Sequence, residues 1–146
     1  MLLFLDVDGV LHPDINYNKD MLFSKLPMLE DVLRARPGVE IVISSTWRST
    51  RTLQELKLIF SPDIAPRIIG TTPHWREFQD EATLGTYVRQ AEIEQWLRTA
   101  ERAWELWVAL DDQPHLFRPF CPNLLLTNPA TGLNETVANM LFNRLS

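Results

Sequence analysis

The sequence predicts an α/β fold in which a central parallel sheet of about five strands carries helices on both faces. Short apolar runs alternate with segments of helical periodicity from one end of the chain to the other, which is typical of parallel strands joined by crossover helices. The first run, Leu2–Leu5, is apolar at every position, as expected of a strand that is buried on both faces. Polar residues directly follow several of the runs, at the strand ends where such folds bind ligands.

The individual elements follow from these patterns. The predicted strands are residues 2–5, 39–43, 67–70, 106–110 and 123–127. Apolar residues recur at helical spacing in the segments 27–36, 52–60, 93–100 and 133–141, which are the predicted helices. Pro27 suits the first turn of the first helix, and Thr52 with Glu55 has the spacing of a capping box at the start of the second.

Residues 71–87 interrupt this alternation. They show neither strand nor helix periodicity, and a connection of this length inside a domain is commonly functional or mobile. We therefore expect a loop here that contacts the substrate. Trp75 lies within it and could stack on a base or another ring.

Length and composition limit the class of protein. A chain of 146 residues has the usual length of one domain, and we expect a single domain over residues 1–146. The net charge of −5 argues against a protein that coats nucleic acid, although a local basic patch could still handle one phosphate. The single cysteine, Cys121, fits a reducing compartment, and no run reaches the roughly 20 apolar residues of a membrane span. These features predict a cytoplasmic protein that does not span a membrane.

The end of the first strand carries two acids and a glycine, Asp6, Asp8 and Gly9. Because side chains alternate along a strand, the two acids leave it on the same side. Carboxylates this close repel each other unless a cation or a proton lies between them, and oxygen ligands suit Mg²⁺. Gly9 permits a sharp turn close to a ligand. The same pattern also occurs in ordinary turns, so its meaning depends on the other strand ends.

Two further strand ends are polar. The hydroxyl residues Ser44 and Ser45 follow the second strand, and Asp111 and Asp112 follow the fourth. The carboxylates at these ends, with no cluster of His or Cys, favour Mg²⁺ over zinc. A carboxylate beside a metal can attack phosphorus, and a second acid can protonate the leaving oxygen. The alternative is that the paired acids only open a loop or cap a helix.

The stretch Asp6-Val7-Asp8-Gly9-Val10-Leu11 resembles the first motif of the haloacid dehalogenase (HAD) superfamily, DxDGx followed by Leu, Thr or Val. The resemblance spans nearly the whole chain and implies a Rossmann-like HAD fold. It also implies that Asp6 is the nucleophile and a metal ligand. Asp8 would then be the general acid and base, and would bind the metal through its backbone carbonyl.

The later motifs of the superfamily resemble three other stretches. The end of the second strand is similar to the motif whose Ser or Thr binds the phosphoryl group, and one register selects Ser44 where another selects Ser45. The basic residue of the third motif, more often Lys, is best matched by Arg89, which could also be an ordinary solvated arginine. Asp111 and Asp112 resemble the fourth motif, with Asp112 favoured as the direct metal ligand.

The chain resembles members of the superfamily that have a minimal cap or none, because residues 12–37 hold little more than a loop and one helix and residues 71–87 are too few for a folded cap. Open sites of this kind serve large substrates such as proteins or nucleic-acid ends, or take a lid from a partner subunit. The stretches 43–48, 89–97 and 110–112 are also similar to a small bacterial subgroup whose relatives include HAD domains associated with RNA-repair proteins.

The expected function is a Mg²⁺-dependent phosphohydrolase, a phosphomonoesterase that forms an aspartyl-phosphate and acts on an RNA end, another nucleic-acid end or another large substrate. One alternative is a phosphatase for a nucleotide or sugar phosphate, covered by the 71–87 loop or by a second subunit. Another is a binding or regulatory module without turnover. The histidines at positions 12, 74 and 115 lack metal-ligand spacing and are expected at the surface or behind the site, with His12 near enough to reach substrate.

Overall fold

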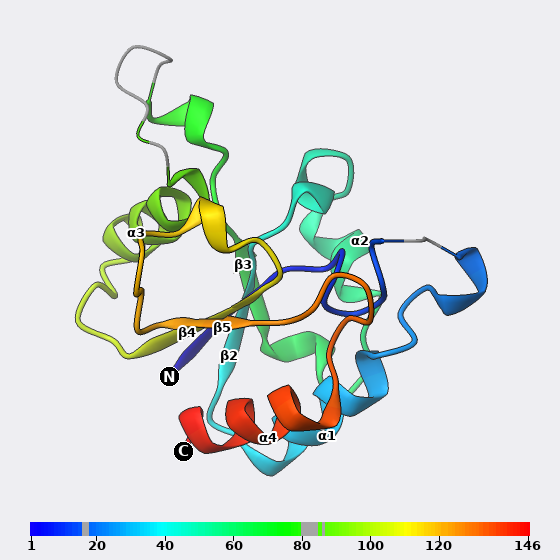
Figure 1. Cartoon of the computed structure of the whole chain (residues 1–146). Helices are drawn as coiled ribbons and strands as arrows, with labels where there is room; N and C mark the ends of the chain where they lie inside the picture. Colours follow the sequence, from blue (N-terminus) through cyan, green and yellow to red (C-terminus); the bar gives the residue numbers. More distant parts are fainter. Residues whose placement is uncertain (16–17, 80–84, 86) are drawn as a thin grey trace.

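The computed structural model describes the whole chain except residues 16–17, 80–84 and 86 (Figure 1). The described residues form one five-stranded sheet with the order β3-β2-β1-β4-β5, in which every pair of neighbours is parallel. This confirms the predicted fold class. The strands are β1 (Leu2–Leu5), β2 (Glu40–Ile43), β3 (Ile68–Thr71), β4 (Trp107–Asp111) and β5 (Leu124–Leu126).

Helices cover both faces of the sheet, as predicted. The helices α1 (Leu26–Ala35) and α4 (Glu135–Arg144) pack against each other on one face, where α2 (Leu53–Lys57) adds Leu56 to the same apolar cluster (Figure 1). The opposite face is covered by α3 (Val88–Thr99), which contributes Ile93 and Leu97 to a second cluster. Short 3-10 helices lie in the connections: η1 (Lys19–Met21), η2 (Thr46–Ser49), η3 (Ala65–Arg67), η4 (Trp75–Glu77) and η5 (Pro114–Leu116).

Local capping explains where two of these helices begin. The Thr52 hydroxyl accepts a hydrogen bond from the Glu55 backbone N–H at 3.2 Å, and the Glu55 carboxylate accepts one from the Thr52 N–H at 3.1 Å, which is the predicted capping box of α2. At the start of α4 the Asn134 side chain accepts from the Val137 N–H at 2.9 Å. These bonds satisfy backbone groups that a helix end leaves unpaired.

The register of the sheet brings its polar strand ends into one row. Leu5 of β1 is paired with Ile43 of β2 and Leu110 of β4, and Ile43 is paired in turn with Thr71 of β3. Backbone hydrogen bonds continue this ladder by one residue. The next residues therefore lie side by side across the sheet, with their side chains on the α3 face, in the order Thr72, Ser44, Asp6 and Asp111.

The connections add little to this core. Between β1 and α1, and between β3 and α3, the described residues contain only η1 and η4, so no folded cap occurs among them. Of the predicted 71–87 loop, residues 80–84 and 86 lie outside the described part of the chain. In the part that is described, no helix is both long enough and apolar enough to cross a membrane.

Candidate active site at the carboxyl ends of the strands

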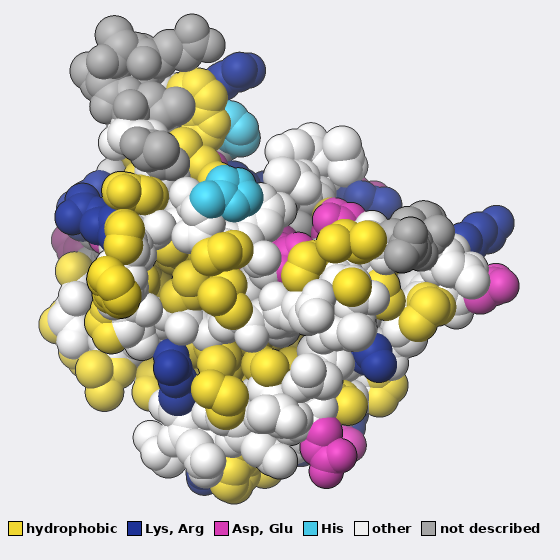
Figure 2. Space-filling view, in the orientation of Figure 1, with side chains coloured by type: hydrophobic (Ala, Val, Ile, Leu, Met, Phe, Trp, Pro, Cys, Tyr) yellow, Lys and Arg dark blue, Asp and Glu magenta, His cyan; other side chains and the backbone are white. Residues whose placement is uncertain are grey.

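Three acids meet where the central strands end. Asp6 follows β1, Asp111 is the last residue of β4, and Asp112 comes next, and a carboxylate oxygen of each lies within 4.8 Å of those of the other two. All three residues are buried. We call Asp6, Asp111 and Asp112 the acid cluster. Figure 2 shows the surface hollowed between the projecting segment that carries η4 and the segment that follows β2.

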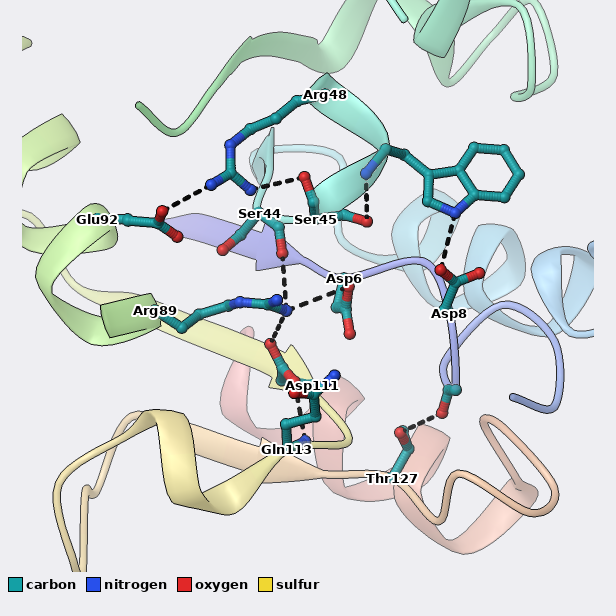
Figure 3. Close-up of polar contacts among 12 residues, drawn as sticks. Asp6, Asp8, Ser44, Ser45, Arg48, Arg89, Glu92, Asp111, Gln113 and Thr127 are labelled. Carbon is teal, nitrogen blue, oxygen red and sulfur yellow. Dashed lines mark hydrogen bonds and ion pairs between the residues drawn. The ribbon is translucent and has the colours of Figure 1, made fainter. Parts of the chain in front are cut away.

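Arg89 neutralises part of this cluster. It lies in the first turn of α3, and its Nη1 is 2.8 Å from Asp111 Oδ2 and 3.2 Å from Asp6 Oδ1 (Figure 3). The same nitrogen donates to the backbone carbonyl of Ser44 at 3.3 Å. Arg89 is therefore not a solvated helix-end arginine: it is buried and joins the ends of β1, β2 and β4.

The cluster places three carboxyl groups beside one cation, Arg89. Burial is the main reason that the pKa of Asp6 lies well above its usual range, and the charge of Asp111 raises it further while Arg89 lowers it. Burial likewise raises the pKa of Asp112. Within the described residues, Asp6 Oδ2, Asp112 Oδ1 and Ser44 Oγ are buried without a hydrogen-bond partner. Unpaired carboxylate oxygens in a buried group of three fit a hard cation such as Mg²⁺.

Gly9 makes the close approach of Asp112 possible. Its φ is +77°, in the left-handed region, and a Cβ at this position would overlap the Asp112 carboxylate. The Thr127 hydroxyl donates to the Gly9 carbonyl at 2.6 Å, which ties the turn to the end of β5. The predicted acidic turn is thus fixed by both a steric requirement and a buried hydrogen bond.

Asp8 is held apart from the acid cluster. His12 Nε2 lies 2.8 Å from Asp8 Oδ1, and Trp47 Nε1 donates to Asp8 Oδ2 at 2.9 Å. His12 Nδ1 accepts from the Phe23 backbone N–H at 3.3 Å, so Nε2 carries the proton that is donated to Asp8. The hydrogen bond from His12 is the main reason that the pKa of Asp8 lies below its usual value. In Figure 3 the Asp8 carboxylate lies apart from Asp6.

The two serines have different surroundings. Ser44 lies beside Asp6 in the row of strand ends, and its carbonyl accepts from Arg89. The Ser45 hydroxyl instead accepts from the Trp47 backbone N–H at 3.2 Å and caps η2, and its carbonyl accepts from Arg48 at 2.6 Å. Of the two serines, Ser44 is thus the one whose hydroxyl has no hydrogen-bond partner among the described residues, and it lies next to the nucleophile candidate.

A second buried ion pair joins η2 to α3. Arg48 Nη2 lies 2.7 Å from Glu92 Oε2, and the two side chains are 8% and 4% exposed. Glu92 also accepts from the Trp75 backbone N–H at 2.9 Å, which anchors η4 to α3. The sequence analysis did not assign a role to Glu92. The sequence did contain an indication of this role, because Glu92 is three residues after Arg89 and the two side chains therefore lie on the same face of the helix.

The structure brings most predicted site residues together. Asp6, Asp111, Asp112, Arg89 and Ser44 meet at one point, whereas the carboxylate of Asp8 and the hydroxyl of Ser45 are engaged elsewhere. The expectation for the histidines holds for His12 only in part: it lies behind the site but is 1% exposed, packed against Phe23 and Trp47. Nothing in its sequence neighbourhood indicates this aromatic packing, because Trp47 is far away along the chain.

A family model described as "HAD domain in Swiss Army Knife RNA repair proteins" matches residues 2–138. No curated protein and no solved structure matches the chain. The match covers all five strands and the whole acid cluster, and it agrees with the motifs in Asp6–Leu11 and at Asp111 and Asp112. The chain therefore belongs to the family of HAD domains in Swiss Army Knife RNA repair proteins.

Proposed function

We propose that the chain is a Mg²⁺-dependent phosphomonoesterase that forms an aspartyl-phosphate on Asp6. Membership of the family supports a phosphatase-like hydrolase at the level of the HAD superfamily. The observation that carries the finer proposal is the state of the Asp6 carboxylate. Arg89 holds its Oδ1 at 3.2 Å, while the buried Oδ2 has no hydrogen-bond partner among the described residues.

The acid cluster would hold the metal ion. Asp6, Asp111 and Asp112 supply carboxylate oxygens, and the resemblance to the superfamily adds the backbone carbonyl of Asp8. This all-oxygen donor set suits Mg²⁺. When bound, Mg²⁺ supplies positive charge that stabilises the transferred phosphoryl group and the carboxylates around it.

The protein side chains carry the bond changes. In the first step an Asp6 oxygen forms a bond to phosphorus, the bond to the leaving oxygen breaks, and that oxygen takes a proton from Asp8. In the second step Asp8 takes a proton from water as the water oxygen attacks phosphorus. The bond between phosphorus and Asp6 then breaks and releases inorganic phosphate. The Ser44 hydroxyl donates to a phosphoryl oxygen, and Arg89 adds positive charge beside it.

The two hydrogen bonds on Asp8 define its resting state. Both carboxylate oxygens accept from N–H groups, of His12 and Trp47, which favours the ionised form. Asp8 must exchange at least one of these bonds for a proton before it can act as an acid. Substrates with good leaving groups, such as aryl phosphates, should therefore depend less on Asp8 than alkyl phosphates do.

A phosphorylated RNA end or other nucleic-acid end is the substrate class that we propose, because the family is that of RNA repair proteins and the described residues include no folded cap over the site. A nucleotide or sugar phosphate is the alternative that the same chemistry would serve. We further propose that residues 1–146 act as one domain in the cytoplasm, where the single thiol of Cys121 would stay reduced.

The test is hydrolysis of para-nitrophenyl phosphate with Mg²⁺, with EDTA, and by Asp6→Asn. We expect Mg²⁺-dependent turnover that Asp6→Asn abolishes. Asp31→Asn is the matched control, since Asp31 is an exposed acid on α1 whose side chain is 80% exposed. Calorimetric titration with Mg²⁺ completes the test. A protein that binds Mg²⁺ but hydrolyses neither this ester nor phosphorylated RNA would be a binding module and would refute the proposal.

A further inference from the structure

A cavity of about 510 Å³ lies between the carboxyl end of β3, η4 and the last turns of α3. Its volume is within the range of about 300–1,000 Å³ that is usual for small-molecule sites. Six of the residues that line it are Arg48, Ser49, Thr72, Phe78, Gln95 and Trp96. We call it the β3-end cavity.

The row of strand ends sets the distance between this cavity and the nucleophile candidate. Thr72 and Asp6 occupy the same level of the sheet, because Thr71, Ile43 and Leu5 are paired across β3, β2 and β1. Neighbouring strands lie about 4.8 Å apart, so two spacings place Thr72 about 10 Å from Asp6. Ser44 lies between them. A substrate with its phosphate at Asp6 and Ser44 could therefore place the adjoining group in the cavity.

Charge indicates what that adjoining group is. The titratable residues that line the cavity are one arginine, one acid and one histidine. The Arg48 guanidinium is already paired with Glu92 at 2.7 Å, and His74 Nδ1 accepts from the Arg76 backbone N–H at 3.2 Å, beside the acid Glu77. The lining therefore offers no lysine and no unpaired arginine for a second phosphate. Its other polar side chains are the hydroxyls of Ser49, Thr71, Thr72 and Thr99 and the amide of Gln95. A neutral group with several hydrogen-bonding atoms is the complementary occupant.

Aromatic rings and polar atoms without hydrogen-bond partners indicate more closely which chemical group the cavity binds. Phe78 and Trp96 present aromatic surface, on which bases commonly stack. Thr72 is 2% exposed and its Oγ1 has no hydrogen-bond partner among the described residues, and the same holds for Nε of Arg48. A buried hydroxyl without a hydrogen-bond partner destabilises the folded state by about 1–3 kcal/mol relative to one that has a partner. A Val at position 72 would avoid this cost if the residue had only a structural role.

From these observations we propose that the β3-end cavity binds the nucleoside next to the scissile phosphate. The proposal rests on the proposed function, because it takes the phosphate to lie at Asp6 and Ser44. The base packs against the aromatic surface of Phe78 and Trp96, and the sugar hydroxyls and base edge pair with Thr72 and Gln95. The nucleoside can belong to a mononucleotide or to the last residue of an RNA strand.

The first experiment compares kcat/KM for adenosine 5′-monophosphate, adenosine 3′-monophosphate, a short RNA with a terminal phosphate, and para-nitrophenyl phosphate. The readout is the ratio of each nucleotide value to the para-nitrophenyl phosphate value, so a general loss of folded protein cancels. Thr72→Val should lower this ratio about tenfold for the loss of one hydrogen bond, and Ser49→Trp should lower it further by filling the mouth. Thr136→Val, at an exposed position on α4, is the matched control.

The second experiment is independent of turnover. Adenosine is titrated into ¹⁵N-labelled protein, and the indole N–H signal of Trp96 is followed after assignment with Trp96→Phe. We expect a saturable shift in the wild-type protein and in Thr136→Val, a weaker one in Thr72→Val, and none in Ser49→Trp.

The outcomes separate this proposal from the proposed function. Turnover of para-nitrophenyl phosphate with an unchanged ratio in both cavity variants and no adenosine shift would overturn the cavity proposal alone. Adenosine binding that Ser49→Trp removes, without turnover of any ester, would overturn the proposed function and leave the cavity as a nucleoside site. With both intact, a higher kcat/KM for the RNA end or for the mononucleotide identifies the source of the nucleoside.

Discussion

Substitution of Arg89 provides the clearest test of how the charge of the acid cluster is neutralised. Its Nη1 lies 2.8 Å from Asp111 and 3.2 Å from Asp6, and the side chains of Arg89, Asp111 and Asp6 are 6%, 2% and 4% exposed. Arg89→Met keeps much of the aliphatic length but leaves the two carboxylates without their cation. Removing one partner of a buried ion pair costs about 3–5 kcal/mol, and we expect a loss of this size in EDTA.

The measurement is urea unfolding at neutral pH, in EDTA and in Mg²⁺. Because a domain is usually stable by only about 5–15 kcal/mol, the loss should lower the unfolding midpoint strongly. Mg²⁺ should restore part of it, since a ligand that binds only the native state stabilises that state. In the wild-type protein the gain from Mg²⁺ should be smaller, because Arg89 already supplies one positive charge.

Arg34→Met is the matched control for this experiment. Arg34 also pairs with an acid, Asp63, at 2.7 Å, but its side chain is 44% exposed. Exposed pairs contribute about 0–1 kcal/mol, so this variant should unfold nearly as the wild type does in either buffer. The reasoning is refuted if Arg89→Met costs no more than Arg34→Met in EDTA, or if Mg²⁺ stabilises neither the wild type nor Arg89→Met.

Three further predictions follow from the same contacts. The raised pKa of Asp6 means that the native state holds an extra proton, so in EDTA stability should fall as pH rises from the ordinary carboxylate pKa through that of folded Asp6. Thermal unfolding across pH should show this slope in the wild type and not in Asp6→Asn; equal slopes would contradict it. Trp47→Phe removes a hydrogen bond to Asp8 and should raise the pKa of Asp8 toward its usual value, moving the pH profile of alkyl-phosphate hydrolysis to higher pH. Its stability cost should be near the low end of about 1.5–3 kcal/mol because Asp8 is partly exposed, and an unchanged profile would count against Asp8 as the acid. Gly9→Ala meets both a φ of +77° and a steric overlap, so calorimetry should show weakened Mg²⁺ binding, whereas Gly38→Ala, with no atom within 4 Å, should bind as the wild type does.

The fold could be predicted because its signals are local. Each strand is a short apolar run, and each helix has apolar residues at its own period, so the alternation can be recognised without any tertiary contact. The convergence of Asp6, Asp111 and Asp112 was predictable for a related reason. In a parallel sheet the carboxyl ends of all strands lie at one edge, and residues that follow the strands meet there.

The choice between Ser44 and Ser45 depended on register, which the sequence does not determine. A shift of one residue exchanges the two faces of a strand. The pairing of Ile43 with Leu5 places Ser44 beside Asp6 and leaves the Ser45 hydroxyl to cap η2. The sequence could therefore indicate the hydroxyl pair but not the member that faces the acids.

The surroundings of Asp8 could not be predicted for a different reason. His12, Phe23 and Trp47 come from three separate segments, and their rings meet only after α1 and η2 have packed against the sheet. No local period connects them. His12, whose neighbours in the sequence do not indicate such a role, is therefore a buried hydrogen-bond donor to Asp8, the proposed general acid.

The distribution of unpaired polar atoms connects the acid cluster with the β3-end cavity. In the part of the chain that is described, six buried side-chain atoms lack a hydrogen-bond partner, and five of them belong to Asp6, Asp112, Ser44, Arg48 and Thr72. Each such atom costs about 1–3 kcal/mol, yet the core behind them is apolar and well buried. Most of this cost thus falls at one edge of the sheet, where atoms of a metal ion, a phosphoryl group and a nucleoside would complete the missing contacts.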